Sequence, residues 1–221
     1  DALNTMGANI NGISTDKIII EGVEELQGAD LDVIPDRIEA GTYLIAGAAM
    51  GEITLNYCNP NHLDVLIEKL IQAGAIIDTS ENSISIKKAN PINPVDVTTE
   101  VYPGFPTDLQ AQWIALMAIA SGSSVVTDTV YHDRFTHIPE LNRLGANIEL
   151  HDNIAKINGV DHLIGAPVMS TDIRASAALI LGAIMARGQT DISRVYHIDR
   201  GYELIEKKFQ ALGVDIVRKN D

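Results

Sequence analysis

The sequence contains few aromatic residues, a single cysteine and no long apolar run. Aromatic residues make up 5% of its 221 residues, so a core drawn from the 46% of apolar residues consists mainly of Ala, Ile, Leu and Val. The apolar run from Ala177 to Met185 is too short to cross a bilayer, and we expect neither a membrane span nor a signal peptide. The lone Cys58 has no second cysteine for a disulfide, which fits a cytoplasmic location.

Positive charge is also scarce. The chain has 16 Lys and Arg residues against 30 Asp and Glu residues, which gives a formal net charge of −14. Nucleic acids and anionic membranes bind clustered Lys and Arg, so we expect neither as a partner. An anionic substrate would require a few arginines to converge locally within an acidic protein.

Three segments of the chain repeat one pattern. Each begins with a short polar stretch, continues into an Ala- and Gly-rich apolar helix, and ends at a glycine. The repeats begin at Pro35-Asp36-Arg37-Ile38-Glu39-Ala40, Pro106-Thr107-Asp108-Leu109-Gln110-Ala111 and Ser170-Thr171-Asp172-Ile173-Arg174-Ala175. Because these helices are apolar nearly all round, we expect each to be buried on every side.

The same elements follow each repeated helix. A strand comes first, then an amphipathic helix that ends at Gly74, Gly145 or Gly213, where a left-handed cap is expected. A second strand follows the amphipathic helix, and the first two repeats add a third. The expected strands are 52–57, 75–77 and 83–87; 123–129, 146–150 and 154–158; and 190–195 and 214–217.

This pattern predicts an α/β fold of repeated β-α-β-α-β-β units with pseudo-threefold symmetry around buried helices. The units span about 30–90, 95–160 and 165–221, and together they form a domain from residue 26 to 221. The segment Leu3–Ile10 nearly duplicates Leu141–Ile148. Residues 1–25 are therefore predicted to be the tail of a preceding domain that the sequence does not include, and the third unit ends one strand early.

Five longer motifs extend the comparison beyond periodicity. They are PDRIEAGT at 35–42, PGFPTDLQAQ at 103–112, Arg134-Phe135 with Pro139-Glu140-Leu141, TDIRAS at 171–176 and HIDRGYE at 197–203. With them the chain resembles, from residue 1 to 221, the C-terminal half of the bacterial enolpyruvyl transferases that act on UDP-N-acetylglucosamine.

The resemblance implies an inside-out α/β barrel fold in which two domains of three units close on the substrates. It implies transfer of the enolpyruvyl group of phosphoenolpyruvate to the 3′-hydroxyl of UDP-N-acetylglucosamine, the first committed step of peptidoglycan synthesis. It implies no metal and no organic cofactor. The partner of this chain would be the other domain of the same enzyme, without which we expect negligible turnover.

The resemblance also assigns site residues. Asp108 matches the carboxylate that contacts the sugar 3′-hydroxyl and acts as its general base, a role needed because the hydroxyl loses a proton as it attacks. The alternative is an aspartate in the first turn of a helix with Thr107 as its N-cap. Arg134 and Arg200 match positions that bind the carboxylate and phosphate of phosphoenolpyruvate, which suits planar guanidinium groups. The alternative for both is surface ion pairing.

Three further positions follow from the same comparison. Asp172 and Arg174 occupy the third repeat in register with Asp108 and Gln110; the resemblance places Asp172 among the catalytic residues and Arg174 near the phosphate. The alternative is helix capping with a local surface pair. Val130 matches a position that contacts the UDP-sugar.

Other polar residues receive structural interpretations. The catalytic cysteine of the family lies in the domain that this chain lacks, so Cys58 is expected to be structural. His132, His137 and His197 lack metal-ligand spacing and are expected in turns or the core. A further hypothesis is that the three helix starts at Asp36, Thr107 and Thr171 aim free N–H groups at one anion-binding cleft.

Three other classes remain as alternatives. The shikimate-pathway enolpyruvyl transferase shares the fold but has different motifs. A non-catalytic repeat module is favoured if Asp108, Arg134 and Arg200 scatter over the surface. RNA-cyclase enzymes use related units but call for a more basic surface.

Overall fold

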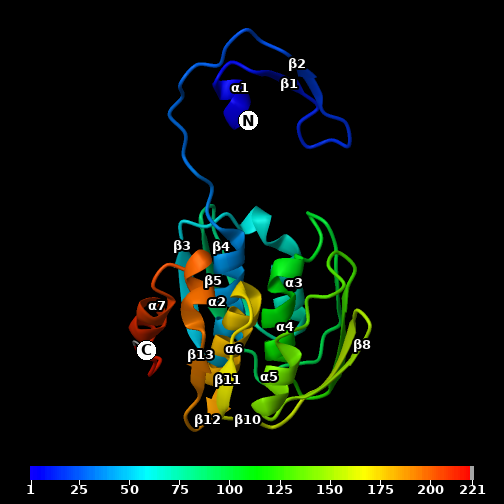
Figure 1. Ribbon diagram of the computed structural model, residues 1–221, viewed down its shortest axis with the longest axis vertical. Coiled ribbons are helices and arrows are strands. Elements are labelled where there is room, and N and C mark those ends of the chain that lie inside the picture. The colour runs from blue at the N-terminus through cyan, green and yellow to red at the C-terminus, as the bar shows by residue number, and fades with distance from the viewer. Residues whose placement is uncertain (220–221) are drawn as a thin grey trace. The chain divides into compact units, whose positions relative to one another are not determined.

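The computed structural model describes residues 1–219 and divides them into two compact units, an N-terminal segment (Asp1–Pro35) and a main domain that begins at Asp36 (Figure 1). The division falls later than the boundary expected after residue 25. The strand expected at the start of the first repeat is absent: residues 22–36 form no strand and are almost entirely exposed. This stretch is acidic and has no neighbouring strand with which to pair.

The N-terminal segment consists of a short helix and a hairpin: α1 (Ala2–Thr5), β1 (Asn9–Asn11) and β2 (Ile19–Glu21). The side chain of Asn4 holds the backbone of Ile10 through two hydrogen bonds of 2.8 and 2.9 Å. Asn142 holds Ile148 in the same way, at 2.9 and 3.1 Å. The duplication seen in the sequence is therefore also a duplication of local structure.

Three buried helices form the centre of the main domain: α2 (Arg37–Met50), α4 (Gln110–Met117) and α6 (Ile173–Met185). They contact one another, and Figure 1 shows them side by side in blue, green and gold. All eight residues of α4 are buried, as are residues 40–49 of α2 and 175–182 of α6. The expectation of helices buried on every side is confirmed.

Small residues allow the central helices to approach their neighbours closely. A Cβ on Gly41 would lie 2.5 Å from Leu109 Cδ1, and one on Gly47 would lie 2.5 Å from Ile86 Cγ2. Both separations are far shorter than van der Waals contact. Few aromatic residues are needed in this core because glycine and alanine let backbones, rather than large side chains, fill the space between helices.

The first two repeats form similar sheets outside these helices. The first has the strand order β3-β5-β4, and the second has the order β6-β7-β9-β8. In both, the last strand of the repeat is central and pairs antiparallel with two neighbours. The strands are β3 (Glu52–Asn56), β4 (Ile76–Thr79), β5 (Ser83–Lys87), β6 (Val97–Thr99), β7 (Ser123–Asp128), β8 (Asn147–His151) and β9 (Ile154–Asn158).

The third repeat forms only part of such a sheet. Strand β11 (Pro167–Met169) pairs parallel with β13 (Asp191–Ser193), as β6 pairs with β7. A separate parallel pair, which the sequence did not predict, joins β10 (Leu163–Ile164) to β12 (Ala186–Arg187). The strand expected at 214–217 does not form, because no counterpart of β5 or β9 lies among the described residues to pair with it.

A groove of about 1300 Å³ lies between β13 and residues 214–217, where a counterpart of β5 or β9 would pair. It is lined by β13 and by the segment after the last helix, with Ile192, Ile205, Val214 and Ile216 among the lining residues. Val214 and Ile216 still pack against the core although they form no strand. The third repeat therefore keeps its helices and its apolar pattern while its sheet remains open.

Outer helices cover each repeat and end as expected. They are α3 (Asp64–Gln72), α5 (Ile138–Arg143) and α7 (Ile205–Ala211). The glycines that follow, Gly74, Gly145 and Gly213, have φ values of 98°, 88° and 87°. Among residues 1–219, no helix combines the length and apolarity that a bilayer crossing needs.

Candidate active site

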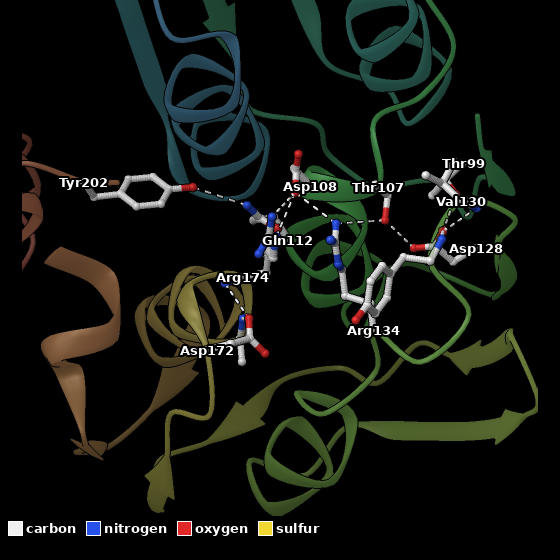
Figure 2. Close-up of polar contacts among 12 residues, drawn as sticks. Thr99, Thr107, Asp108, Gln112, Asp128, Val130, Arg134, Asp172, Arg174 and Tyr202 are labelled. Atoms are coloured by element: carbon white, nitrogen blue, oxygen red, sulfur yellow. Dashed lines mark hydrogen bonds and ion pairs between the residues drawn. The ribbon is translucent and has the colours of Figure 1, made fainter. Parts of the chain in front are cut away.

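Asp108 lies between two arginines at the start of the central helix α4 (Figure 2). Arg134 Nη1 donates to Asp108 Oδ1 at 2.9 Å, and Arg174 Nε donates to the same oxygen at 2.7 Å. Asp108 Oδ2 accepts no hydrogen bond from any of residues 1–219, and the side chain is 35% exposed. One oxygen is thus held by guanidinium groups while the other is open to solvent.

The short 3₁₀ helix η2 (Thr107–Leu109) positions this carboxylate. It is anchored by Phe105, which is buried and meets Trp113 of α4 edge to face at a centroid distance of 5.7 Å. Asp108 does lie in the first turn of a helix, as the alternative predicted, but Thr107 is not its N-cap: the Thr107 hydroxyl makes no capping bond and donates to Asp128 Oδ2 at 2.6 Å. Asp108 is therefore available for contacts beyond its own helix.

Arg134 and Val130 belong to the loop that leaves strand β7. The Arg134 guanidinium lies over the ring of Tyr131, 4.6 Å from its centroid, and also donates to Thr107 Oγ1 at 3.1 Å. Val130 is 42% exposed, as a ligand-contacting residue requires, and its backbone N–H is held by Asp128 Oδ1 at 3.0 Å. The loop thus presents the charged side chain of Arg134 and the apolar side chain of Val130 from a backbone that hydrogen bonds hold in place.

Asp172 caps helix α6, as predicted by the alternative in which this residue has only a structural role. Its Oδ1 accepts from the backbone N–H groups of Arg174 and Ala175, and its Oδ2 accepts from the Thr136 hydroxyl. Burial raises the pKa of Asp172, but these hydrogen bonds and the nearby His137 lower it below the usual range overall. A catalytic role for Asp172 would therefore be that of a fixed carboxylate, since its oxygens are already engaged.

Arg174 does not form the local surface pair that was the alternative to a role in the site. Its guanidinium pairs with Asp108, which lies on a different repeat, rather than with Asp172 beside it. The first turns of α4 and α6 are in this way linked across the centre of the domain.

The hypothesis of three free helix starts holds for one helix at most. Asp36 accepts from the backbone N–H groups of Ile38 and Glu39 and so caps α2, just as Asp172 caps α6. Only the start at Thr107 lacks a side-chain cap. The positive charge that could attract an anion here comes mainly from the arginines.

Arg200 ends the 3₁₀ helix η3 (Val195–Arg200), is exposed, and forms no hydrogen bond or ion pair with any described residue. Its neighbour Gly201 lies close to the first turn of α6, because a Cβ there would lie 2.6 Å from Ile173 Cδ1. The structure therefore brings Asp108, Arg134 and Arg174 into direct contact and leaves Arg200 close to the same end of α6 with an unpaired guanidinium.

A buried polar cluster joins the chain after Arg200 to two central helices. Tyr202 Oη lies 2.8 Å from Thr42 Oγ1, and Gln112 Nε2 donates to Thr42 Oγ1 at 3.1 Å. Burial raises the pKa of Tyr202 to about 12, so it stays a neutral hydroxyl. Gln112, Tyr202 and Asp128 were not identified from the sequence, since an isolated polar residue in an apolar run gives no sign of its partner.

Two other expectations concern residues outside this cluster. Cys58 is buried, and burial raises the pKa of its thiol, which agrees with a structural role. His137 is buried, which lowers its pKa to about 4, so it is neutral at pH 7. The part of the chain that the structure describes has no group of three or more His, Cys, Asp or Glu side chains that could hold a metal ion.

This arrangement can bind anions and accept a proton in one place. Guanidinium groups of Arg134, Arg174 and Arg200 suit carboxylate and phosphate oxygens. The free oxygen of Asp108 can accept a proton from a hydroxyl within hydrogen-bond reach. A carboxylate paired with two arginines at the start of a buried helix, within repeated α/β units, agrees with the enolpyruvyl transferase class of domain.

Comparisons with known proteins agree with this class. The chain belongs to the EPSP synthase (3-phosphoshikimate 1-carboxyvinyltransferase) family, whose family model matches residues 1–209. The solved enolpyruvyl transferase NikO from Streptomyces tendae is 27% identical with a TM-score of 0.86, over 96% of this chain and 51% of that one. An EPSP synthase from Acinetobacter baumannii, 18% identical with a TM-score of 0.76 over 99% of this chain and 54% of its own, shares the fold. The predicted fold class is confirmed.

Curated relatives are more similar in sequence. The chain is 51% identical over 220 residues to a UDP-N-acetylglucosamine 1-carboxyvinyltransferase of Hydrogenovibrio crunogenus, covering 99% of this chain and 53% of the relative. It is 52% identical over 218 residues to the protein of the same name from Chlorobium chlorochromatii, covering 98% and 52%. The chain thus spans about half the length of the curated relatives that it matches.

Proposed function

We propose that this chain forms one half of an enzyme that transfers the enolpyruvyl group of phosphoenolpyruvate to the 3′-hydroxyl of UDP-N-acetylglucosamine and releases phosphate. The observation that supports this most is the Asp108 carboxylate held by Arg134 and Arg174 at the ends of the central helices. The chain is 51% and 52% identical to two proteins named UDP-N-acetylglucosamine 1-carboxyvinyltransferase. The cluster supplies a proton acceptor for the sugar hydroxyl and cations for the anionic groups of the substrates.

The roles of the residues follow from charge and reach. Asp108 Oδ2 takes the proton of the sugar 3′-hydroxyl as the hydroxyl oxygen bonds to C2 of phosphoenolpyruvate, while the C2–C3 double bond takes up a proton at C3. Loss of phosphate from C2 and of a proton from C3 then restores the double bond. Arg134 and Arg200 bind the carboxylate and phosphate of phosphoenolpyruvate, with Arg174 close to the phosphate. Val130 contacts the UDP-sugar.

Substrate binding would also change the contacts of Asp108. Its Oδ1 now accepts hydrogen bonds from two guanidinium groups, and a bound trianionic substrate would compete for the same donors. When Arg134 turns to the substrate, more of the Asp108 carboxylate becomes available to the sugar hydroxyl.

The remaining half of the enzyme is the proposed partner. Two closed domains orient both substrates and exclude water, which one domain cannot do alone. We therefore expect negligible turnover from residues 1–221 by themselves. The proposal includes a place in peptidoglycan synthesis, hence in cell shape and division, and a cytoplasmic location without cofactor or metal.

A full-length chimera tests the reaction. In it, this chain replaces the matching half of the Hydrogenovibrio crunogenus relative, and phosphate release is measured with both substrates. We expect turnover that requires both halves and falls at least about a hundredfold in Asp108→Asn. Asp78→Asn, on the exposed strand β4, is the matched control and should leave the rate unchanged. A folded chimera without turnover would reject the proposal.

The family name supplies a second candidate, transfer to 3-phosphoshikimate. The same chimera should be given 3-phosphoshikimate in place of the UDP-sugar. Turnover with 3-phosphoshikimate but not with UDP-N-acetylglucosamine would reverse the choice. Titration of the isolated chain with either acceptor, followed by NMR, should show shifts that Asp108→Ala removes, and titration with phosphoenolpyruvate should show shifts that Arg200→Ala removes.

A further inference from the structure

A buried carboxylate lies directly behind the candidate site. Asp128, the last residue of β7, is 0% exposed. Its Oδ1 accepts from Thr99 Oγ1 at 2.6 Å and from the backbone N–H groups of Val130 and Tyr131 at 3.0 and 2.9 Å. Its Oδ2 accepts from Thr107 Oγ1 at 2.6 Å. Four donors thus satisfy the acceptor sites of one buried carboxylate.

The donors come from the segments that place the candidate site residues. Thr107 immediately precedes Asp108, and Val130 and Tyr131 belong to the loop that leads to Arg134. Thr99 ends β6, which runs parallel to β7 and ends beside it. Asp128 therefore joins its own loop to Thr99 and Thr107, which lie 29 and 21 residues earlier in the sequence.

The bond through Thr107 has a direction. A carboxylate can only accept and an arginine can only donate, so the single hydroxyl hydrogen of Thr107 points to Asp128. This leaves the lone pairs of Thr107 Oγ1 for Arg134 Nη1, 3.1 Å away, which also donates to Asp108 Oδ1 at 2.9 Å. Figure 2 shows Arg134 reaching both, with Asp128 on the far side of Thr107.

The carboxylate is held in the ionised form that this direction requires. Burial raises the pKa of Asp128, but the hydroxyls of Thr107 and Thr99 and the backbone N–H groups of Tyr131 and Val130 lower it overall. Asp128 is therefore an acceptor only.

We propose that Asp128 is a positioning residue for the transferase reaction. Its buried carboxylate makes the Thr107 hydroxyl an acceptor, which sets how Arg134 meets Asp108 and the anionic substrate, and it fixes the backbone at Val130. The role rests on the proposed function, because it concerns the same site. Asp128 touches no substrate and acts only through Thr107 and the loop.

Four variants separate this role from packing. Asp128→Asn keeps the shape but places an N–H₂ donor opposite Thr107, which reverses the direction of that bond. Thr107→Val keeps the shape and removes the hydroxyl, whereas Thr107→Ser keeps the hydroxyl and loses a methyl group. Thr99→Val removes a buried hydroxyl from the same carboxylate, and with it the acceptor of the Thr129 N–H group, but leaves the hydrogen bond from Arg134 to Thr107 in place, and so serves as the control.

The first measurement uses the ligand-free chain. The NMR signal of the Arg134 Nε–H group, assigned by its loss in Arg134→Lys, reports the guanidinium position. We expect it to shift or broaden in Asp128→Asn and Thr107→Val and to stay in place in Thr107→Ser and Thr99→Val. An unmoved signal in Thr107→Val, or an equal response in Thr99→Val, would overturn the proposal. If Asp128→Asn does not fold, the comparison of Thr107→Val with Thr107→Ser still tests the proposal.

The second measurement uses the chimera. We expect Thr107→Val to raise KM for phosphoenolpyruvate by about tenfold or more while KM for the UDP-sugar changes little, and Thr107→Ser to restore the parent value. A purely structural role would instead make Thr107→Ser more damaging than Thr107→Val, and that result would contradict the proposal. An inactive parent chimera would count against the proposed function alone, because the NMR result on Arg134 does not depend on turnover.

Discussion

The second and third repeats share a sequence pattern but reach different structures. Both have a buried central helix, an outer helix and a glycine in the left-handed region that ends it. The second repeat forms a four-stranded sheet, whereas the third forms the β11–β13 pair and an open groove. The comparison teaches that helices in this fold are specified locally, while a strand requires a neighbour that pairs with it.

The largest difference should appear in core truncations. Ile157 on β9 is 0% exposed, and Ile157→Ala should lower the free energy of unfolding by about 3 kcal/mol through a lost contact and a cavity. Ile192 on β13 is only partly buried beside the groove, and Ile192→Ala should cost about 1 kcal/mol. Urea denaturation monitored by circular dichroism measures both. Equal losses would show that the third repeat is as tightly packed as the second.

Hydrogen exchange should reveal the same contrast at the backbone. Amides of β7 and β9 lie in a sheet with partners on both sides and should exchange slowly. Amides of β13 and of residues 214–217 should exchange far faster, because the groove separates them. Repeating the measurement on the full-length chimera sharpens the test. A rise in protection confined to these residues would mean that the other half of the protein closes the groove.

Acid should destabilise the second repeat more than the third. The pKa of Asp128 is lowered in the folded state, so its contribution is present above its unfolded value, about 4, and is lost as the pH falls through the folded value. Asp128→Asn should therefore flatten the loss of stability as the pH falls below about 4. In the third repeat, the hydrogen bond from Arg218 lowers the pKa of Asp199, but this pair is exposed and screened by salt. Asp199→Asn should leave the acid profile nearly unchanged, and thermal melts across this pH range compare the two.

The smallest effect should be the same in both repeats. Gly145 and Gly213 have φ values of 88° and 87°, and an added Cβ would meet no atom closer than 3.9 Å at either. Gly145→Ala and Gly213→Ala should each cost about 1 kcal/mol, because the strain arises within the residue itself. A marked difference in melting temperature between these two variants would contradict the view that the helix ends are specified locally.

The sequence predicted these helices and their ends because apolar runs and glycines act over a few residues. It also predicted β5 and β9 with their observed boundaries. It wrongly predicted a strand at residues 214–217 and another before α2. A strand does not form at either place, because no neighbouring strand among the described residues pairs with it.

For the site, motif resemblance located Asp108, Arg134 and Arg174, which lie in contact, but could not indicate which oxygen of Asp108 is free. Asp128 and Tyr202 were not foreseen, because their importance lies in partners between 21 and 160 residues away.

The edge of β13 that no strand among residues 1–219 pairs with also affects how the protein behaves in concentrated solution. An exposed strand edge is a template on which a second chain can add. The net charge of −14 opposes such contacts while the ionic strength is low. At 1 M salt the Debye length falls to about 3 Å, and this repulsion acts only at contact. Colloidal stability of this chain should therefore decrease with added salt, and light scattering should rise.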